Sequence, residues 1–162
     1  MSAAAPQSRN RLHEVVLDAS TIPLGVANGD HERAVAIFDL VEDNSFGVQG
    51  RDEGPYSLTI AQSESRLTFK VRSKVGEPIV EFEVSMTPLR PLLKDYFLLC
   101  ETYYSAIRNA SPRQIEAIDR ERAALHNEGA SLIAARIADG IEIDEGTARR
   151  LFTVVSALHW KA

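Results

Sequence analysis

The residues best placed to do chemistry lie in one segment, 112–138, whose apolar residues recur with the period of a helix. A helix turns by about 100° per residue, which places three apolar and three polar residues in one sector: Ile115, Ile118, Arg122, His126, Ile133 and Arg136. Asp119 lies at the edge of this sector, three residues before Arg122. The two guanidinium groups suit an anion or carboxylate site, in which His126 would be the titratable group.

The same residues also permit a purely structural interpretation. A polar group on the apolar side of a helix must find a partner or cost several kcal/mol, roughly 2–7 by transfer measurements. Asp119, Arg122, His126 and Arg136 would then form an internal network that clamps the helix to its neighbours. The sequence favours this network over a ligand site.

Gly129 interrupts the segment and predicts either a break into two helices or a close backbone contact. If the helix breaks there, His126 and Glu128 would lie at a helix end and form a general acid/base pair. If the helix is continuous, Glu128 lies on the opposite, solvent-facing side. Both alternatives stay open at this point.

Other catalytic and ligand motifs are absent from the sequence. It contains no Walker A loop, no GxGxxG, no GxSxG elbow and no CxxC. His31 and Glu32 begin like a zinc peptidase motif, but no second histidine follows at the required spacing. None of the four histidines has a glutamate three residues earlier, as the di-iron helical bundles require. We therefore expect no cofactor and no metal, and whether the protein is an enzyme is left open.

Composition and charge narrow the class of partner. The chain has 162 residues, 44% hydrophobic and 25% charged, with a formal net charge of -5. Residues 1–87 carry 13 acidic and 8 basic residues, whereas residues 88–162 carry 10 of each. Nucleic acid is an unlikely partner, because a protein with a net negative charge is not attracted electrostatically to the phosphate backbone. The partner is unknown from the sequence, and a protein is the class that stays open.

The sequence predicts a soluble, cytoplasmic protein with no membrane partner. The first ten residues lack the apolar stretch of about 7–15 residues that a signal peptide needs, and no apolar run reaches the ~20 residues of a membrane span. The single cysteine, Cys100, lies in an apolar helical stretch and cannot form an internal disulfide. A packed free thiol suits a reducing compartment.

The first half of the chain predicts mainly strands. Leu12–Asp18 predicts a strand, because Val15, Val16 and Leu17 supply β-branched or apolar bulk. A helix with Asp30 as its N-cap is expected to run to about Glu42, with Ala34, Ile37, Phe38 and Val41 at helical spacing. From Ser45 to Met86 the apolar period changes to two, and short turns separate three sets: Tyr56, Leu58 and Ile60; Leu67, Phe69 and Val71; Val80, Phe82, Val84 and Met86. We expect an antiparallel meander that Phe46 and Val48 open.

The second half predicts mainly helices. A helix from about Leu92 to Arg108 has a wide apolar arc and is expected to pack centrally on the sheet. Ser111 and Gln114 form a capping box for the helix that follows, Ile141–Ile143 could add an edge strand, and Asp144 is a plausible N-cap for the last helix. The fold class is therefore α+β, an antiparallel meander of about four to six strands packed against three to five helices. We expect a disordered tail, 1–10, and a single domain, 11–162.

Four strings carry a resemblance to a known family: HERAVAIFDL (31–40), KDYFLLCETYYSAIR (94–108), LHNEGA (125–130) and IEIDEGTARRLFT (141–153). In these strings the chain resembles uncharacterised protein family 0262 of the UPF series, and the likeness covers nearly everything after the N-terminal tail. The resemblance implies a bacterial cytosolic protein of this size. It assigns no activity, cofactor or residue role.

Two functions remain as hypotheses. The first is a non-catalytic cytosolic module for protein interaction or regulation, which the missing catalytic motifs, the acidic first half and the terminal His159 and Trp160 favour. The alternative is a small enzyme or an anion- or carboxylate-binding protein that uses the polar cluster of the long helix. The cluster comprises Asp119, Arg122, His126, Glu128 and Arg136.

Overall fold

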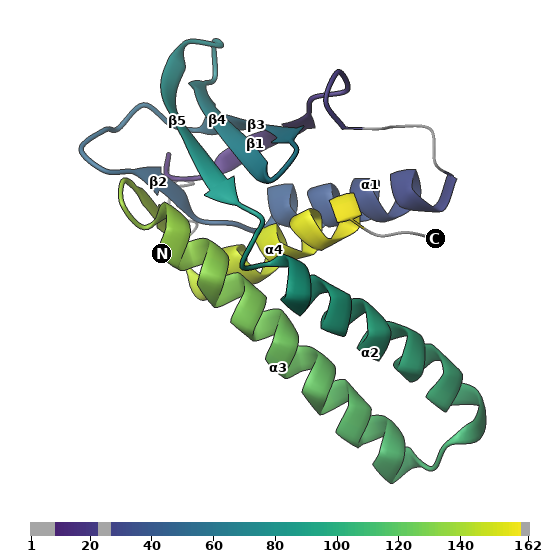
Figure 1. Cartoon of the computed structure of the whole chain (residues 1–162). Coiled ribbons are helices and arrows are strands. Elements are labelled where there is room, and N and C mark those ends of the chain that lie inside the picture. Colours follow the sequence, from purple (N-terminus) through teal and green to yellow (C-terminus); the bar gives the residue numbers. More distant parts are fainter. Residues whose placement is uncertain (1–8, 23–26, 160–162) are drawn as a thin grey trace, which may run out of the picture.

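The computed structural model describes residues 9–22 and 27–159, which form four helices and six strands. In chain order the elements are β1 (Leu12–Leu17), α1 (Ala27–Glu42), β2 (Phe46–Val48), β3 (Tyr56–Ser63), β4 (Arg66–Ser73), β5 (Pro78–Ser85), α2 (Arg90–Asn109), α3 (Pro112–Ile137), β6 (Ile141–Ile143) and α4 (Glu145–His159). The α+β prediction is confirmed. Figure 1 shows the strands gathered at one end and two long helices extending away from them.

The main sheet has the order β1-β3-β4-β5 and contains the predicted meander. Strands β3, β4 and β5 pair antiparallel, and their alternate residues Leu58, Ile60, Leu67, Phe69 and Val84 are buried. The sheet is mixed, however, because β1 pairs parallel to β3. A parallel pair needs a long crossover connection, and the segment containing α1 and β2 supplies it.

The expectation that Phe46 and Val48 open the meander was wrong. They belong to β2, which pairs antiparallel with β6 in a separate two-stranded sheet. The predicted strand Ile141–Ile143 is present, but among the described residues it pairs with β2 and not with the edge of the main sheet. This small sheet joins the loop after α1 to the connection between α3 and α4.

Helix α4 is the central helix of the body. Its buried residues lie on all sides: Thr147, Ala148, Leu151, Phe152, Val154, Val155, Ser156, Ala157 and Leu158. It packs against α1 and α3 beneath the sheet (Figure 1). A helix that is apolar all round belongs in a core, and the string LFTVVSAL (151–158) has that composition.

The prediction that α2 packs centrally on the sheet was wrong. Helix α2 pairs with α3 in a long hairpin that projects from the body (Figure 1). Its buried residues are Leu92, Leu93, Cys100 and Ala106, whereas Ile107 is exposed. Residues 98–124, which we call the arm, contribute no residue to the hydrophobic core of the body. The wide apolar arc of α2 therefore covers α3 on one side and leaves apolar surface on another.

Two of the three predicted helix N-caps are confirmed. The capping box at Ser111 and Gln114 is present, with the Gln114 backbone N–H donating to Ser111 Oγ at 3.3 Å, and the Thr147 backbone N–H donates to Asp144 Oδ1 at 2.8 Å. Asp30, by contrast, is not an N-cap. The helix begins at Ala27, and Asp30 lies in its first turn, where its carboxylate is 3.8 Å from the Arg33 guanidinium.

Gly129 marks a close contact and not a break. Helix α3 is continuous from Pro112 to Ile137, and a Cβ at Gly129 would overlap the ring of Phe152 in α4. Glycine thus lets the two helices approach at this point. The helix-end acid/base pair that a break would have created is therefore not formed.

Most of the predicted N-terminal tail, residues 1–8, lies outside the described residues, as does Trp160. Asn10 is described, and its backbone carbonyl accepts a hydrogen bond from the Phe46 N–H at 2.9 Å. In the described ranges, no helix combines the length and the apolar character that a membrane crossing requires.

Candidate functional site

Arg122 lies in the hairpin, where it contacts one side chain of its own helix and one of α2. Its Nη2 lies 2.6 Å from Asp119 Oδ1, and its guanidinium stacks over the Tyr103 ring at 4.0 Å from the centroid. Burial lowers the pKa of this guanidinium, but the hydrogen bond and charge of Asp119 outweigh burial and raise it. The predicted meeting of Asp119 and Arg122 is thus present as an ion pair within one helix.

His126 lies one turn further along α3, between two aromatic rings. Its ring centroid is 5.7 Å from that of Tyr96 and 5.0 Å from that of Phe152. Its Nε2 is 2.8 Å from Thr153 Oγ1, and the Thr153 hydroxyl donates to the Arg149 carbonyl at 3.0 Å. A hydroxyl has one proton, so we infer that Nε2 carries a proton and donates to Thr153.

The charge state of His126 follows from its surroundings. Burial is the largest cause that lowers its pKa, and the positive charges of Arg149 and Arg122 lower it further. At neutral pH His126 is therefore an uncharged imidazole, which adds no positive charge to an anion site.

Cys100 and Tyr96, which line the same hollow as Arg122, are held in their protonated forms at neutral pH. Burial raises the pKa of the Cys100 thiol, and burial and the neighbouring Cys100 raise the pKa of the Tyr96 hydroxyl. Cys100 is a free cysteine and is buried, as the sequence predicted. A protonated, desolvated thiol is a poor nucleophile.

Two members of the predicted cluster lie apart from the others. Glu128 is exposed on the far side of α3, and Arg136 is exposed near the end of that helix. The buried residues of this end of α3, Ala130, Ile133 and Ile137, centre about 90° around the helix from Arg136, so its side chain reaches solvent. The structure therefore brings together Asp119 and Arg122, places His126 one turn away, and separates Glu128 and Arg136.

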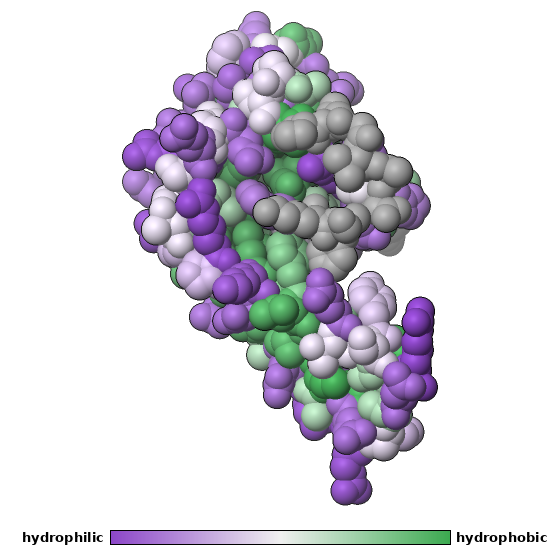
Figure 2. All heavy atoms as spheres, turned by 45° about the vertical axis from the view of Figure 1, so that its right-hand side comes forward, coloured by the Kyte–Doolittle hydropathy of each residue, from purple (hydrophilic) through white to green (hydrophobic). Residues whose placement is uncertain are grey.

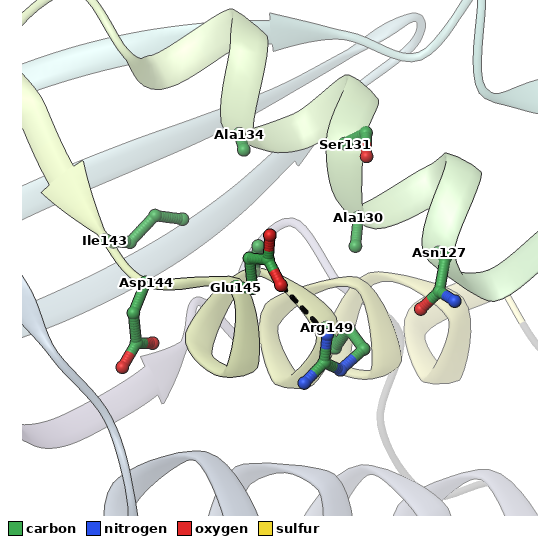
Figure 3. A pocket seen from close by; sticks show the side chains of 9 residues that line it. Asn127, Ala130, Ser131, Ala134, Ile143, Asp144, Glu145 and Arg149 are labelled. Carbon is green, nitrogen blue, oxygen red and sulfur yellow. Dashed lines mark ion pairs between the residues drawn. The ribbon is translucent and has the colours of Figure 1, made fainter.

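A pocket of about 360 Å³ lies between the C-terminal half of α3 and the start of α4. Figure 3 shows Asn127 and Ser131 above it on α3, and Glu145 and Arg149 below it on α4. The Glu145 carboxylate is 3.9 Å from the Arg149 guanidinium. Asp144 also lines the pocket, and its carboxylate accepts a hydrogen bond from the Thr147 backbone N–H. None of the five residues of the predicted cluster lines this pocket.

A second hollow, which we call the arm groove, lies where the hairpin leaves the body. It has a volume of about 190 Å³ and is lined by Glu32, Val35 and Asp39 of α1, by Phe97, Cys100 and Tyr104 of α2, and by Arg122. Figure 2 shows hydrophobic surface on this side of the molecule, continuing from the body onto the base of the arm.

Val35 and Tyr104 line the arm groove and are exposed, and Phe38 and Ile107 are further exposed apolar side chains on the same two helices. Val35 and Phe38 on α1 are 44% and 63% exposed, and Tyr104 and Ile107 on α2 are 61% and 52% exposed. Ile107 follows Cys100 by seven residues and Tyr104 by three, so it continues the groove-facing side of α2 along the arm. We call these four residues the α1–arm surface.

Acidic residues frame the α1 half of this surface. Glu32, Asp39 and Glu42 are exposed and lie on the same side of α1 as Val35, and none of them forms an ion pair with another described residue. The surface therefore combines exposed apolar side chains on both helices with carboxylates along α1, and Arg122 lines the groove between the helices.

The sequence interpretation of α1 missed this surface because it assigned Ala34 and Phe38 to the buried side. The buried residues are Arg33, Ala36 and Leu40, and Ala34 is exposed. The buried Arg33 extends to the carbonyl of Leu158 at 3.4 Å. The spacing of 33, 36, 37, 40 and 41 was the helical signal that could have revealed it.

Comparison with known proteins identifies the family. The model of the Uncharacterised protein family (UPF0262) matches residues 9–161. The chain belongs to this family. UPF0262 proteins of Azorhizobium caulinodans and Xanthobacter autotrophicus are each 53% identical to it, over 94% and 93% of this chain and 95% and 93% of theirs. The UPF0262 protein of Brucella anthropi is 50% identical over 99% of both chains.

Membership of UPF0262 confirms the resemblance found in the sequence and brings no activity with it, because the names of these relatives state none. No solved structure matches this chain. Within the part of the chain that the structure describes, no group of three or more His, Cys, Asp or Glu side chains is arranged to hold a metal ion.

Proposed function

We propose that this protein is a non-catalytic interaction module that binds a partner protein through the α1–arm surface. One contrast carries the proposal. Arg122 and His126, the polar groups at the base of the arm, are satisfied by Asp119, Tyr103 and Thr153, whereas the apolar side chains around the arm groove are exposed. Contiguous exposed apolar surface on a small protein is typical of an interface.

The chemistry of the surface specifies its occupant. Exposed apolar side chains beside the carboxylates of Glu32, Asp39 and Glu42 fit a partner segment with an apolar stripe flanked by lysine or arginine. The anion- or carboxylate-binding alternative lacks a comparable observation, because the guanidinium of Arg122 is already paired and the imidazole of His126 is uncharged.

A cytoplasmic location is part of the proposal. Its support is Cys100, the single cysteine, which is a buried free thiol, as is usual in proteins of a reducing compartment.

Photo-crosslinking in bacterial cells tests the proposed function. A photo-reactive phenylalanine analogue would replace Phe38 or Tyr104 in the full chain, with Val75 as the control position. Val75 is an apolar residue that is 81% exposed at the turn between β4 and β5. We expect a discrete protein adduct from positions 38 and 104 and none from position 75.

The charge requirement makes this test specific. Combining Glu32→Lys and Asp39→Lys with the analogue at Tyr104 should reduce the adduct, because the reversed charges repel a basic segment. No adduct at either position, or an adduct that charge reversal leaves unchanged, would refute the proposed function.

A further inference from the structure

We infer that the occupant of the α1–arm surface is the arm of a second copy of this chain. The two copies are related by a two-fold axis, and the arm of each packs against α1 of the other. This inference rests on the proposed function and names the partner that the surface binds.

The arm is the part of the molecule with the least support from its own body. Residues 98–124 add nothing to the hydrophobic core, and within this stretch the buried residues are Cys100 and Ala106. Helical segments shorter than about 12–15 residues are marginal in water without tertiary contacts. Tyr104 and Ile107 leave apolar surface along one side of α2. A second chain packed on that side would supply the contacts that the body does not.

One charge at the outer end of α2, that of Arg108, is opposite in sign to the carboxylates of α1. Arg108 follows Tyr104 by four residues and so lies on the same side of α2. It is exposed and forms no ion pair with another described residue. The outer end of α2 thus presents two apolar side chains and a guanidinium, whereas α1 presents two apolar side chains bordered by carboxylates. The arm has the chemistry that the proposed occupant requires.

Two-fold symmetry lets both copies satisfy this match at once. From residue 98 to its end at Asn109, α2 is about 18 Å long, at a rise of about 1.5 Å per residue. When two arms lie antiparallel, the end of each comes to the base of the other, where α1 lies. Tyr104, Ile107 and Arg108 of one copy then meet Val35, Phe38 and Asp39 of the other, and each contact is made twice.

Solution mass measurements on the purified full chain test the inference, by light scattering after gel filtration and by sedimentation. At about 100 μM, where a dimer with a Kd of about 1 μM predominates, we expect twice the chain mass. Phe38→Glu and Ile107→Glu each bury a charge in the interface and should weaken the dimer by at least about tenfold. Leu98→Glu is the matched control, because Leu98 lies on the same helix at 53% exposure, half a turn around from Ile107.

A charge exchange tests the pairing of the arm with α1. Arg108→Glu and Asp39→Arg should each weaken the dimer, and their combination in one chain should restore it, because the exchanged charges attract again. Circular dichroism and thermal melts of each variant establish that it is folded. All of these positions are exposed, so the fold should tolerate the substitutions.

Three outcomes would overturn the inference: a monomeric wild-type chain at about 100 μM, a dimer that withstands both Phe38→Glu and Ile107→Glu, or one that Leu98→Glu disrupts equally. The crosslinking described above separates this failure from that of the proposed function. Adducts from Phe38 and Tyr104 whose mass is not twice that of the chain would retain the proposed function and reject a second copy as the occupant.

Discussion

At the residue scale, the polar side chains of α3 behave as parts of the structure. Asp119 and Arg122 are three residues apart, so their ion pair could be predicted from helical geometry alone. The partners of His126 could not, because Thr153 and Phe152 come from α4 and only the packing of α3 on α4 brings them near. Sequence spacing specifies neighbours within one helix. It does not specify the contacts between helices.

His126 leads to a prediction about pH. Its pKa in the folded protein lies below its ordinary value of 6.5, so as the pH falls the unfolded chain binds the proton first. The stability that neutral His126 contributes is therefore complete above about pH 6.5 and is lost as the pH falls through the folded-state pKa. We expect His126→Gln, whose amide can still donate to Thr153, to lose less stability than the wild type between about pH 7 and pH 5.

Urea unfolding at a series of pH values measures this difference. The pKa of His159 is also lowered by burial, but His159 is present in both proteins, so the comparison isolates His126. Parallel stability profiles for the two proteins would contradict the assignment of a buried, neutral imidazole.

At the scale of elements, the apolar periodicity of the sequence predicted most strands and helices correctly. It did not predict which strands pair or what each helix packs against. The alternation in β3 and β4 identified strands because each has one buried face. The parallel partner of β1 and the pairing of β2 with β6 depend on contacts distant in sequence, which a period does not encode. The apolar arc of α2 was equally ambiguous, because a helix that covers another helix and one that covers a sheet have similar arcs.

Contact between α3 and α4 at Gly129 gives the second prediction. Alanine at an exposed position in a helix would be favourable by about 1 kcal/mol relative to glycine. At Gly129, however, the new Cβ would overlap the Phe152 ring, and overpacking of this kind costs about 1–3 kcal/mol. We expect Gly129→Ala to lower the free energy of unfolding by at least about 1 kcal/mol in urea titrations.

Gly146→Ala is the matched control. There the nearest group to a new Cβ is the end of the flexible Arg150 side chain, which can move, so little or no loss of stability is expected. The smaller side chain of Phe152→Leu should relieve the overlap, and the double variant with Gly129→Ala should then lose less stability than the sum of the two single losses. Additive losses would show that Phe152 is not the group that excludes a side chain at Gly129.

At the scale of the whole molecule, stability is unevenly distributed between the body and the arm. Residues 151–158 of α4 are buried on almost every side, whereas residues 98–124 pack mainly against each other. Regions with few buried apolar contacts open locally at a lower free energy than the core. In a monomer the amide hydrogens of the arm should therefore exchange much faster than those of α4.

If the proposed dimer forms, amide hydrogen exchange in the arm should depend on protein concentration more strongly than in the rest of the chain. Raising the protein concentration buries Tyr104 and Ile107 against a second copy, which slows opening of the arm, while α4 already exchanges at the rate of the body. Peptides covering 98–124 should become protected with concentration, and peptides covering 151–158 should not. The Ile107→Glu variant should show no such dependence, and Leu98→Glu should retain it. The amide hydrogens of the wild-type arm could instead exchange at one rate over about a hundredfold range of protein concentration around a micromolar Kd. The stability of the arm would then come from within the monomer, and the proposed dimer would be excluded.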